Sequence, residues 1–282
     1  MPTKKKKPSK PNPNAKRHAV RSATDGKFVS ADSKQTRIER WSKPGALGFA
    51  HWIKDVQPHI LTSRNTYEPF KPTHKQLDQI KKILAVDDSG NFINSMSLLI
   101  APRRMGKSLV YALIICWLFT SRKNLTIQLL GNHEVHCRRV QYRTLKRIIR
   151  HTPKLSAMIP EKNVTVYEIR YRSNIIQMGT TNLSGSFGDK LDVLWTSDLH
   201  ASPDLDPFNA YQAALLDSEN SLCLIDSNVD HTDGHVHALQ RQAEQDESIF
   251  CDHTHFRDLT SYLKSAPPWI NRQKAKGSEM LM

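Results

Sequence analysis

The sequence predicts an α/β fold in which a mainly parallel central sheet is flanked by helices. From Met96 onward, short apolar runs typical of buried strands alternate with longer segments of helical periodicity, as in parallel sheets with crossover helices. Residues 108–120 are apolar on nearly every side, which indicates a helix enclosed by such a layered fold. With 282 residues, the chain is long enough to bury a sizeable core in one large domain or two small ones.

Each expected element rests on a local pattern. Residues 73–84 repeat apolar side chains at helical spacing, which predicts an amphipathic helix. Asn132 is expected to cap a further helix, and Ser173-Asn174 marks a turn that joins two strands as a hairpin. Helices are expected at residues 48–55, 73–84, 108–120, 132–150, 208–216 and 237–245, and strands at 97–101, 125–130, 164–169, 174–178, 191–196, 222–226 and 248–252.

Residues 1–40 are expected to form a disordered basic arm. They are rich in Lys, Pro, Ser and Asn and contain almost no aromatic residues, so burial cannot offset the entropy lost on ordering them. The run Lys4-Lys5-Lys6-Lys7 is either a polyanion-binding arm or a solvated tail. The predicted organisation is therefore an arm at 1–40, an ordered domain at 41–270 and a tail at 271–282.

Positive charge is unevenly distributed along the chain. The formal net charge is +14, and residues 1–43 alone carry 13 Lys and Arg against 3 Asp and Glu. Residues 122–172 carry 12 basic and 3 acidic residues, whereas residues 173–282 carry 7 and 16. A uniformly basic nucleic-acid-binding protein is therefore excluded, and a local basic strip is favoured.

Composition also excludes secreted and membrane-spanning proteins. The four cysteines are scattered without a CxxC spacing, which is typical of reduced thiols in an intracellular protein. The longest apolar run, at 109–119, has 11 residues, well short of the roughly 20 that span a bilayer. No apolar segment follows the basic N-terminus, so a signal peptide is not expected, and neither is a membrane partner.

The motif with the clearest chemistry is Ala101-Pro-Arg-Arg-Met-Gly-Lys-Ser108, between a predicted strand and a predicted helix. It matches the phosphate-loop spacing G-x-x-x-x-G-K-[ST] except that Ala101 replaces the first glycine. Gly106 lets the backbone curl around phosphate oxygens, Lys107 reaches the β- and γ-phosphates, and the Ser108 hydroxyl is a ligand for Mg²⁺. The alternative is an ordinary strand-to-helix turn capped by a serine.

The loop, with its R-x-x-G-K-S pattern and alanine in place of the first glycine, resembles the ATPase of the large terminase subunit. Those proteins are the motors that package DNA into tailed-phage and herpesvirus capsids. The resemblance covers about residues 65–270 and implies a P-loop NTPase fold with ATP and Mg²⁺ as cofactors. It also implies double-stranded DNA, a portal protein and a small terminase subunit as partners, and a homo-oligomeric ring on the portal. The expected location is the host cell cytoplasm, for a viral protein that is not a virion component after packaging.

The resemblance places the catalytic carboxylates at the end of a later strand. Terminases end that strand with Asp-Glu, whereas this chain reads Leu191-Asp-Val-Leu-Trp-Thr-Ser-Asp-Leu-His-Ala201. Either Ser197 takes the Asp position and Asp198 the Glu position, or Asp198 is the carboxylate on the Mg²⁺ side. Asp198 is the expected catalytic residue in both alignments, and Asp204 or Asp206 is a candidate for the second carboxylate.

Three further segments match the family in order. Gln76 lies in a stretch that resembles the adenine-reading segment, and an exposed helix surface is the alternative. Ser227 and Asn228 follow the next strand, where terminases and helicases place a turn that couples the γ-phosphate to DNA movement; a plain strand-end turn is the alternative. The Gly-Ser segment at 185–188 has Phe187 where the family has an arginine, and Lys190 is the nearest cation.

The expected site residues can be grouped by role. Arg103 is expected near the γ-phosphate, where a guanidinium stabilises transition-state charge; a surface arginine is the alternative. Nucleotide binding is assigned to Gln76, Ala101, Pro102, Arg103, Arg104, Met105, Gly106, Lys107 and Ser108, Mg²⁺ to Ser108 and Asp198, catalysis to Arg103, Lys107 and Asp198, and coupling to Ser227 and Asn228.

Two clusters lie outside the phosphate-loop motifs. At 100° per residue, one face of helix 132–150 would present a basic stripe to DNA, or a solvated surface. The stripe consists of Arg139, Arg143, Lys146 and Arg150. The second cluster could gather around Zn²⁺, although its spacing matches no standard zinc pattern and surface histidines are the alternative. It consists of His231, His235, His237, Cys251, His253 and His255.

Terminase large subunits usually continue into an RNase-H-like nuclease, whereas this sequence reaches Met282 about where the connecting linker begins. Either the gene product is truncated or split, or the nuclease is on a separate chain, and no nuclease activity is expected from this chain alone. Residues 271–282 are then a tail or the start of that linker. The leading hypothesis is the ATPase motor of a viral DNA-packaging terminase, which couples ATP hydrolysis to translocation of double-stranded DNA into a procapsid. A helicase-like P-loop DNA-dependent ATPase and a catalytically weak nucleotide- and DNA-binding module are the alternatives.

Overall fold

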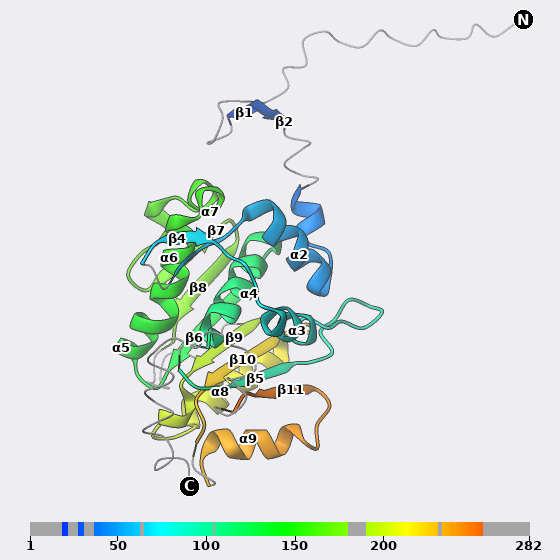
Figure 1. The fold of residues 1–282 in the computed structure, drawn as a ribbon, viewed down its shortest axis with the longest axis vertical. Coiled ribbons are helices and arrows are strands. Elements are labelled where there is room, and N and C mark those ends of the chain that lie inside the picture. Colours follow the sequence, from blue (N-terminus) through cyan, green and yellow to red (C-terminus); the bar gives the residue numbers. More distant parts are fainter. Residues whose placement is uncertain are drawn as a thin grey trace, which may run out of the picture.

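A seven-stranded, mainly parallel sheet forms the centre of the computed structural model, which describes residues 19–21, 28–30, 37–62, 65–103, 105–179, 190–230 and 233–255. The strand order is β11-β5-β10-β9-β6-β8-β7, and only the β7–β8 pair is antiparallel (Figure 1). The strands are β5 (Met96–Ile100), β6 (Thr126–Gly131), β7 (Glu168–Tyr171), β8 (Asn174–Met178), β9 (Val193–Ser197), β10 (Leu222–Ser227) and β11 (Ile249–His253). The predicted α/β class and the predicted hairpin are confirmed.

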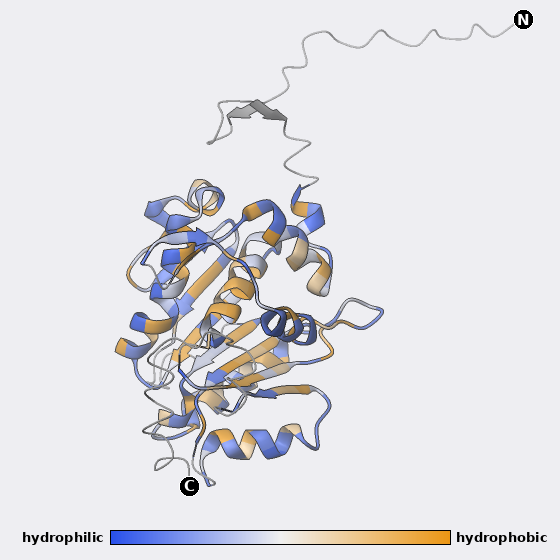
Figure 2. Ribbon diagram, in the orientation of Figure 1, coloured by the Kyte–Doolittle hydropathy of each residue, from blue (hydrophilic) through white to orange (hydrophobic). Residues whose placement is uncertain are grey.

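Helices cover both faces of this sheet. They are α2 (Gly45–Val56), α3 (His74–Ile83), α4 (Lys107–Ser121), α5 (Glu134–Cys137), α6 (Arg143–His151), α7 (Pro153–Met158), α8 (Asp206–Ala214) and α9 (His235–Ala243). Apolar side chains of α2, α3, α4 and α6 pack on one face, and those of α8 and α9 pack on the other. Figure 2 shows the resulting hydrophobic strands and the hydrophobic α4 in the interior.

The alternation of side chains along the strands decides which of them face α4. On β10, Leu222 and Leu224 belong to the core on the α4 side, whereas Cys223 and Ile225 belong to the core on the α8 and α9 side. Because successive side chains point to opposite faces, the face that carries Leu224 next carries Asp226. The buried pattern of α4 follows from this position, since the helix lies between the sheet and the outer helices.

The expected continuous helix from Asn132 to Arg150 is wrong. The cap is His133, whose ring Nδ1 accepts a hydrogen bond from the His136 amide at 3.0 Å. A π-helical segment, Arg138–Tyr142, then separates α5 from α6. The wider turn directs Gln141 into the core, where its amide donates to the carbonyl oxygen of Trp195 at 2.6 Å, and a π-helical turn of this kind interrupts the 100° spacing on which the prediction relied.

Other differences are smaller. An antiparallel hairpin, β3 (His59–Leu61) with β4 (Tyr67–Pro69), was not expected from the sequence. Within the segment expected to be disordered, β1 (Ala19–Arg21) pairs with β2 (Phe28–Ser30), and the rest of residues 1–36 lies outside the described residues. The predicted helices and strands otherwise agree with the observed ones to within a few residues. None of the described helices is both long and apolar enough to cross a membrane.

Asp55 on α2 ties the preceding segment to the domain. Its carboxylate forms an ion pair with Arg40 and accepts a hydrogen bond from the Trp41 indole nitrogen at 2.8 Å. Partial burial raises the pKa of Asp55, but the bonds from Arg40 and Trp41 outweigh burial and leave the pKa below its ordinary value. The ionised carboxylate therefore stabilises the folded chain above the unfolded-state pKa of about 4, and this contribution is lost as the pH falls through the folded-state pKa.

We expect Asp55→Asn to lower the free energy of unfolding by about 1 kcal/mol at pH 7, after allowance for partial exposure. Urea unfolding at pH 7 and below pH 4 measures this, and the difference from wild type should shrink at the lower pH. Asp88→Asn, at an exposed turn position, is the matched control. An unchanged midpoint at pH 7 would contradict the assignment.

Candidate nucleotide-binding site

The predicted phosphate loop connects β5 to the first turn of α4. Gly106 has a φ of 84°, in the left-handed region that favours glycine. A Cβ added there would lie 2.9 Å from the Gln76 side-chain nitrogen, at the end of a side chain that can move, so the backbone conformation is what favours glycine here. The loop borders an open cavity of about 420 Å³, lined by Arg103, Met105, Gly106, Lys107, Ser108, Leu109, His136, Val140, Asp198, Asp226 and Asn228.

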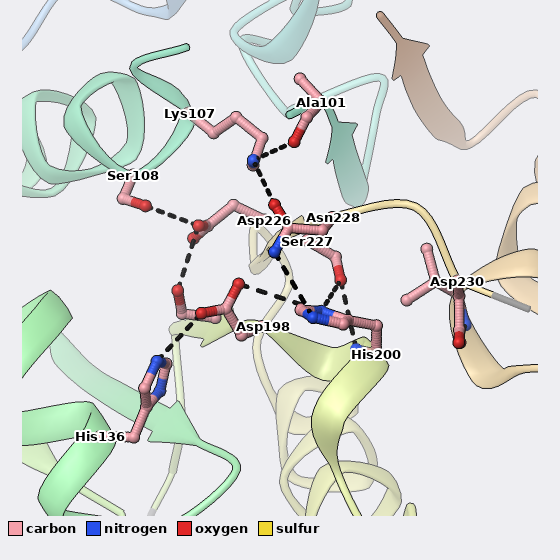
Figure 3. Close-up of polar contacts among 12 residues, drawn as sticks. Ala101, Lys107, Ser108, His136, Asp198, His200, Asp226, Ser227, Asn228 and Asp230 are labelled. Carbon is pink, nitrogen blue, oxygen red and sulfur yellow. Dashed lines mark hydrogen bonds and ion pairs between the residues drawn. The ribbon is translucent and has the colours of Figure 1, made fainter. Parts of the chain in front are cut away.

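Lys107 bridges the loop and the end of β10. Its side-chain nitrogen donates to the Ala101 carbonyl oxygen, and lies 3.4 Å from both the Pro102 carbonyl oxygen and the Asn228 Oδ1 (Figure 3). Burial lowers the pKa of Lys107, while the charges of Asp226 and Asp198 oppose this change. A phosphate in the cavity would give this buried ammonium an anionic partner in place of neutral carbonyl groups.

Asp226 is the carboxylate that contacts the loop serine. Its Oδ2 accepts hydrogen bonds from the hydroxyls of Ser108 at 2.6 Å and Ser197 at 3.1 Å, and its Oδ1 accepts one from the Trp195 indole nitrogen at 2.6 Å. The side chain is only 2% exposed. Burial raises the pKa of Asp226, an effect that the Ser108 and Trp195 bonds partly offset. Trp195, Ser197 and Asp226 meet because they lie on the strand faces directed towards α4.

Asp198 follows β9 and has a left-handed backbone, with a φ of 55°. Its Oδ2 lies 3.0 Å from His136 Nε2, and its Oδ1 lies 3.9 Å from His200 Nδ1. Burial would raise the pKa of Asp198, but the hydrogen bond from His136 and the electrostatic influence of His136, His200 and Lys107 bring it below the ordinary value. The side chain therefore lines the cavity as an ionised carboxylate at neutral pH.

Ser227 and Asn228, the expected coupling residues, lie between His200, which follows β9, and Lys107 of the phosphate loop. The Ser227 hydroxyl accepts from the His200 amide at 3.2 Å and lies 3.0 Å from His200 Nδ1. The Asn228 side-chain nitrogen lies 3.4 Å from His200 Nε2, while its oxygen faces Lys107. Asn228 thus lies between Lys107 and the segment Leu199–Ala201, and a coupling role for Ser227 and Asn228 stays a prediction.

The remaining predicted nucleotide-binding residues lie around the loop. Gln76 sits beside Gly106, but its Oε1 accepts from the Thr73 amide at 3.0 Å in the capping box that begins α3. Arg103 is exposed at the rim of the cavity. Arg104 lies outside the described residues, as does the Gly-Ser segment at 185–188.

Other candidates lie apart from the cavity. Asp204 and Asp206 are exposed and are not among its lining residues. Lys190 forms an ion pair with Asp192 at 3.5 Å. In the portion of the chain that the structure describes, no three His, Cys, Asp or Glu side chains form a metal-binding group; His231 of the proposed zinc cluster lies outside it.

The basic stripe is only partly continuous. Arg143, Lys146 and Arg150 share α6, whereas Arg139 lies in the π-helical segment. Arg143 is exposed, Lys146 lies over the Tyr142 ring, and Arg150 forms an ion pair with Glu161 at 2.8 Å. Binding of DNA at these residues stays a prediction.

Sequence reasoning missed Asp226, His136 and His200 as site residues. Asp226 had a signal, since it ends a buried strand one residue before the expected coupling turn. The parallel order of the sheet, which brings that end beside the phosphate loop, supplies the remaining information. His136 belongs to no local motif, and only the fold brings it to Asp198.

Comparison with solved structures identifies the fold. No protein-family model and no curated protein matches the chain. The crystal structure of the HK97 bacteriophage large terminase matches with a TM-score of 0.64 at 14% identity, over 80% of this chain and 51% of that one. A large terminase from a thermophilic bacteriophage, in complex with ATP-gamma-S, gives 0.51 at 14% identity, over 72% and 48%. A mutant ATPase domain of the Thermus phage P74-26 large terminase gives 0.50 at 11%, over 73% and 89%.

This chain therefore has the α/β fold of phage large terminase ATPase domains. It spans about half the length of the HK97 chain and of the chain in complex with ATP-gamma-S. The predicted P-loop fold is confirmed, and the likeness extends over most of the chain.

Proposed function

We propose that this chain is the ATPase motor subunit of a viral DNA-packaging terminase, which couples ATP hydrolysis to translocation of double-stranded DNA into a procapsid. The observation that carries the proposal is the meeting of Lys107 and Ser108 with Asp198 and Asp226 around one cavity. Adjacent parallel strands place these groups at the same edge of the sheet. That fold is shared with a phage large terminase in complex with ATP-gamma-S.

Each side chain has a role that its position supports. Lys107 and Arg103 neutralise the β- and γ-phosphates, and Asp198 orients the attacking water. Ser227 and Asn228 couple the state of the nucleotide to the DNA grip. The oxygen-only donors near Ser108 fit Mg²⁺, which prefers carboxylates, hydroxyls, phosphates and water; when bound, the ion supplies charge neutralisation at the phosphates.

The proposed partners are double-stranded DNA, a portal protein and a small terminase subunit, with several copies of the chain forming a ring on the portal in the host cell cytoplasm. Arg143, Lys146 and Arg150 are the proposed DNA contacts, because they place three cations along one helix. Phosphate contacts of this kind bind duplex DNA in a salt-dependent way.

The test is steady-state ATP hydrolysis by the purified chain with and without linear duplex DNA. Hydrolysis above the background of a Lys107→Ala preparation, and stimulated by duplex DNA, is the expected result. Turnover no greater than that background under either condition would overturn the motor proposal and favour a weak binding module. Separation of DNA strands by the purified chain would instead favour a helicase-like ATPase.

We expect the double variant Arg143→Ala/Lys146→Ala to weaken duplex DNA binding while basal ATP hydrolysis changes little. The logarithm of the DNA-binding constant falls as the logarithm of the salt concentration rises, and each lost phosphate contact should make this slope shallower by about 1. DNA affinity is measured by fluorescence anisotropy at several salt concentrations from about 50 to about 200 mM, the range over which such affinities change strongly. Lys81→Ala, an exposed lysine on α3, is the control, and an equal loss in both variants would exclude a specific DNA-facing role for α6.

A further inference from the structure

Strand β9 ends in a hydroxyl side chain, and the carboxylate beside it comes from the neighbouring strand. Ser197 ends the strand, and its hydroxyl donates to Asp226 Oδ2 at 3.1 Å. Asp226 is the direct partner of Ser197 in the parallel register of β9 and β10. The side chains of the two residues thus lie on the same face, with a hydroxyl on β9 and a carboxylate on the strand beside it.

The position of strand β10 brings the Asp226 carboxylate to the phosphate loop. It lies between β5, which leads into the phosphate loop, and β9. Asp226 Oδ2 is 2.6 Å from the Ser108 hydroxyl in the first turn of α4. Trp195 holds the other carboxylate oxygen at 2.6 Å, so the carboxylate has a fixed orientation with one oxygen directed to Ser108.

A purely structural role does not require a charge at this position. An asparagine of the same shape could accept from Trp195 and donate to the hydroxyls of Ser108 and Ser197, with no ion to bury. Burying a carboxylate among neutral partners costs free energy unless a cation compensates it. The three groups that donate hydrogen bonds to Asp226 within the described part of the chain, two hydroxyls and an indole, are all neutral. Burial raises the pKa of Asp226 and the nearby charge of Lys107 acts to lower it, but the Lys107 nitrogen is directed to the Ala101 and Pro102 carbonyl oxygens and to Asn228.

Asp198 occupies a different environment. Its left-handed backbone turns the side chain beyond the end of β9, towards His136 at 3.0 Å and His200. We propose that Asp226 on β10, together with Ser108, supplies the magnesium-side oxygen ligands in this chain, and that Asp198 is thereby left to orient the attacking water. This inference rests on the proposed nucleotide-hydrolysing function.

The test is the magnesium dependence of ATP-gamma-S binding, measured by calorimetry with and without magnesium chloride. Asp226→Asn should lower the gain in affinity that magnesium gives by at least about tenfold, while magnesium-free affinity stays within about threefold of wild type. Asp198→Asn should keep the magnesium gain. A second readout is the electron paramagnetic resonance of Mn²⁺ in the presence of ATP-gamma-S, whose bound fraction should fall in Asp226→Asn alone.

Thermal unfolding checks that Asp226→Asn is folded. Its midpoint should stay close to that of wild type, because asparagine can keep the hydrogen bonds to Trp195, Ser108 and Ser197. Ser197→Asp added to Asp226→Asn returns a carboxylate to β9 and should restore part of the magnesium gain. If magnesium raises the ATP-gamma-S affinity of Asp226→Asn as much as that of wild type, or no longer raises that of Asp198→Asn, the inference is overturned while the proposed function stands. Wild-type chain that binds no ATP-gamma-S with or without magnesium would overturn the proposed function, and this inference with it.

Discussion

Replacement of Lys107 by alanine is expected to lower kcat/KM for ATP by about 100- to 1000-fold, the range found when a preorganised charge-stabilising donor is removed. The side chain is 8% exposed, and its nitrogen is held between the loop carbonyls and Asn228. A phosphate that enters the cavity meets this ammonium without a large rearrangement. Alanine leaves the phosphate charge unneutralised beside Asp198 and Asp226, which are themselves negative when ionised.

Steady-state hydrolysis measures the loss of kcat/KM, and ATP-gamma-S binding measures how much of that loss is weaker nucleotide binding. Lys107→Arg should be nearly as impaired, because the planar guanidinium does not fit the position of a compact ammonium. The exposed Lys81→Ala on α3 should hydrolyse ATP at the wild-type rate. Activity of Lys107→Ala within threefold of wild type would show that the loop does not bind the transferred phosphate.

The phosphate loop was predictable because its determinants are local. A buried strand, a glycine two residues before a serine and an apolar helix stand next to one another in the sequence. The left-handed Gly106 and the buried Lys107 follow from that order alone. The strand and helix pattern that follows also sufficed for the α/β class, since helical and extended periodicities are distinct.

The pair of carboxylates in the site, Asp198 and Asp226, was not predictable in the same way. The sequence places Asp198 near the correct edge of the sheet, but the partner of Ser108 is Asp226, 118 residues from it in the chain. Only the strand order, in which β10 separates β5 from β9, brings the two together. A search confined to one strand end finds a serine and infers a degenerate site.

The π-helical segment shows another limit. Periodicity assumes a constant rotation per residue, and Arg138–Tyr142 departs from it. Tertiary contacts favour the departure, because Gln141 and Tyr142 both bond to carbonyl oxygens of neighbouring segments. These contacts join parts of the chain that are distant in sequence, so a local sequence pattern cannot predict them. Of the predicted basic stripe, Arg139 lies in this segment, whereas Arg143, Lys146 and Arg150 lie on α6.

The second large effect is expected at Asp198. Asp198→Asn should lower kcat by about 100-fold or more, within the range lost when a group that directs proton transfer is removed, and leave ATP-gamma-S affinity within about threefold. Asparagine is the suitable substitution because it tolerates the left-handed backbone at φ 55°. It also keeps an oxygen for the hydrogen bond from His136, so the change removes charge and basicity while it preserves shape.

Single-turnover hydrolysis with saturating ATP measures the chemical step at Asp198 separately from binding. Because the pKa of Asp198 lies below its ordinary value, the carboxylate is ionised throughout the neutral range, and the rate should show no titration of this group above about pH 5. Asp204→Asn and Asp206→Asn are matched controls, since both residues are exposed and absent from the cavity lining. If either of them loses kcat while Asp198→Asn keeps more than a third of it, the water-orienting carboxylate belongs to the loop after β9, and the left-handed turn at Asp198 has a structural role only.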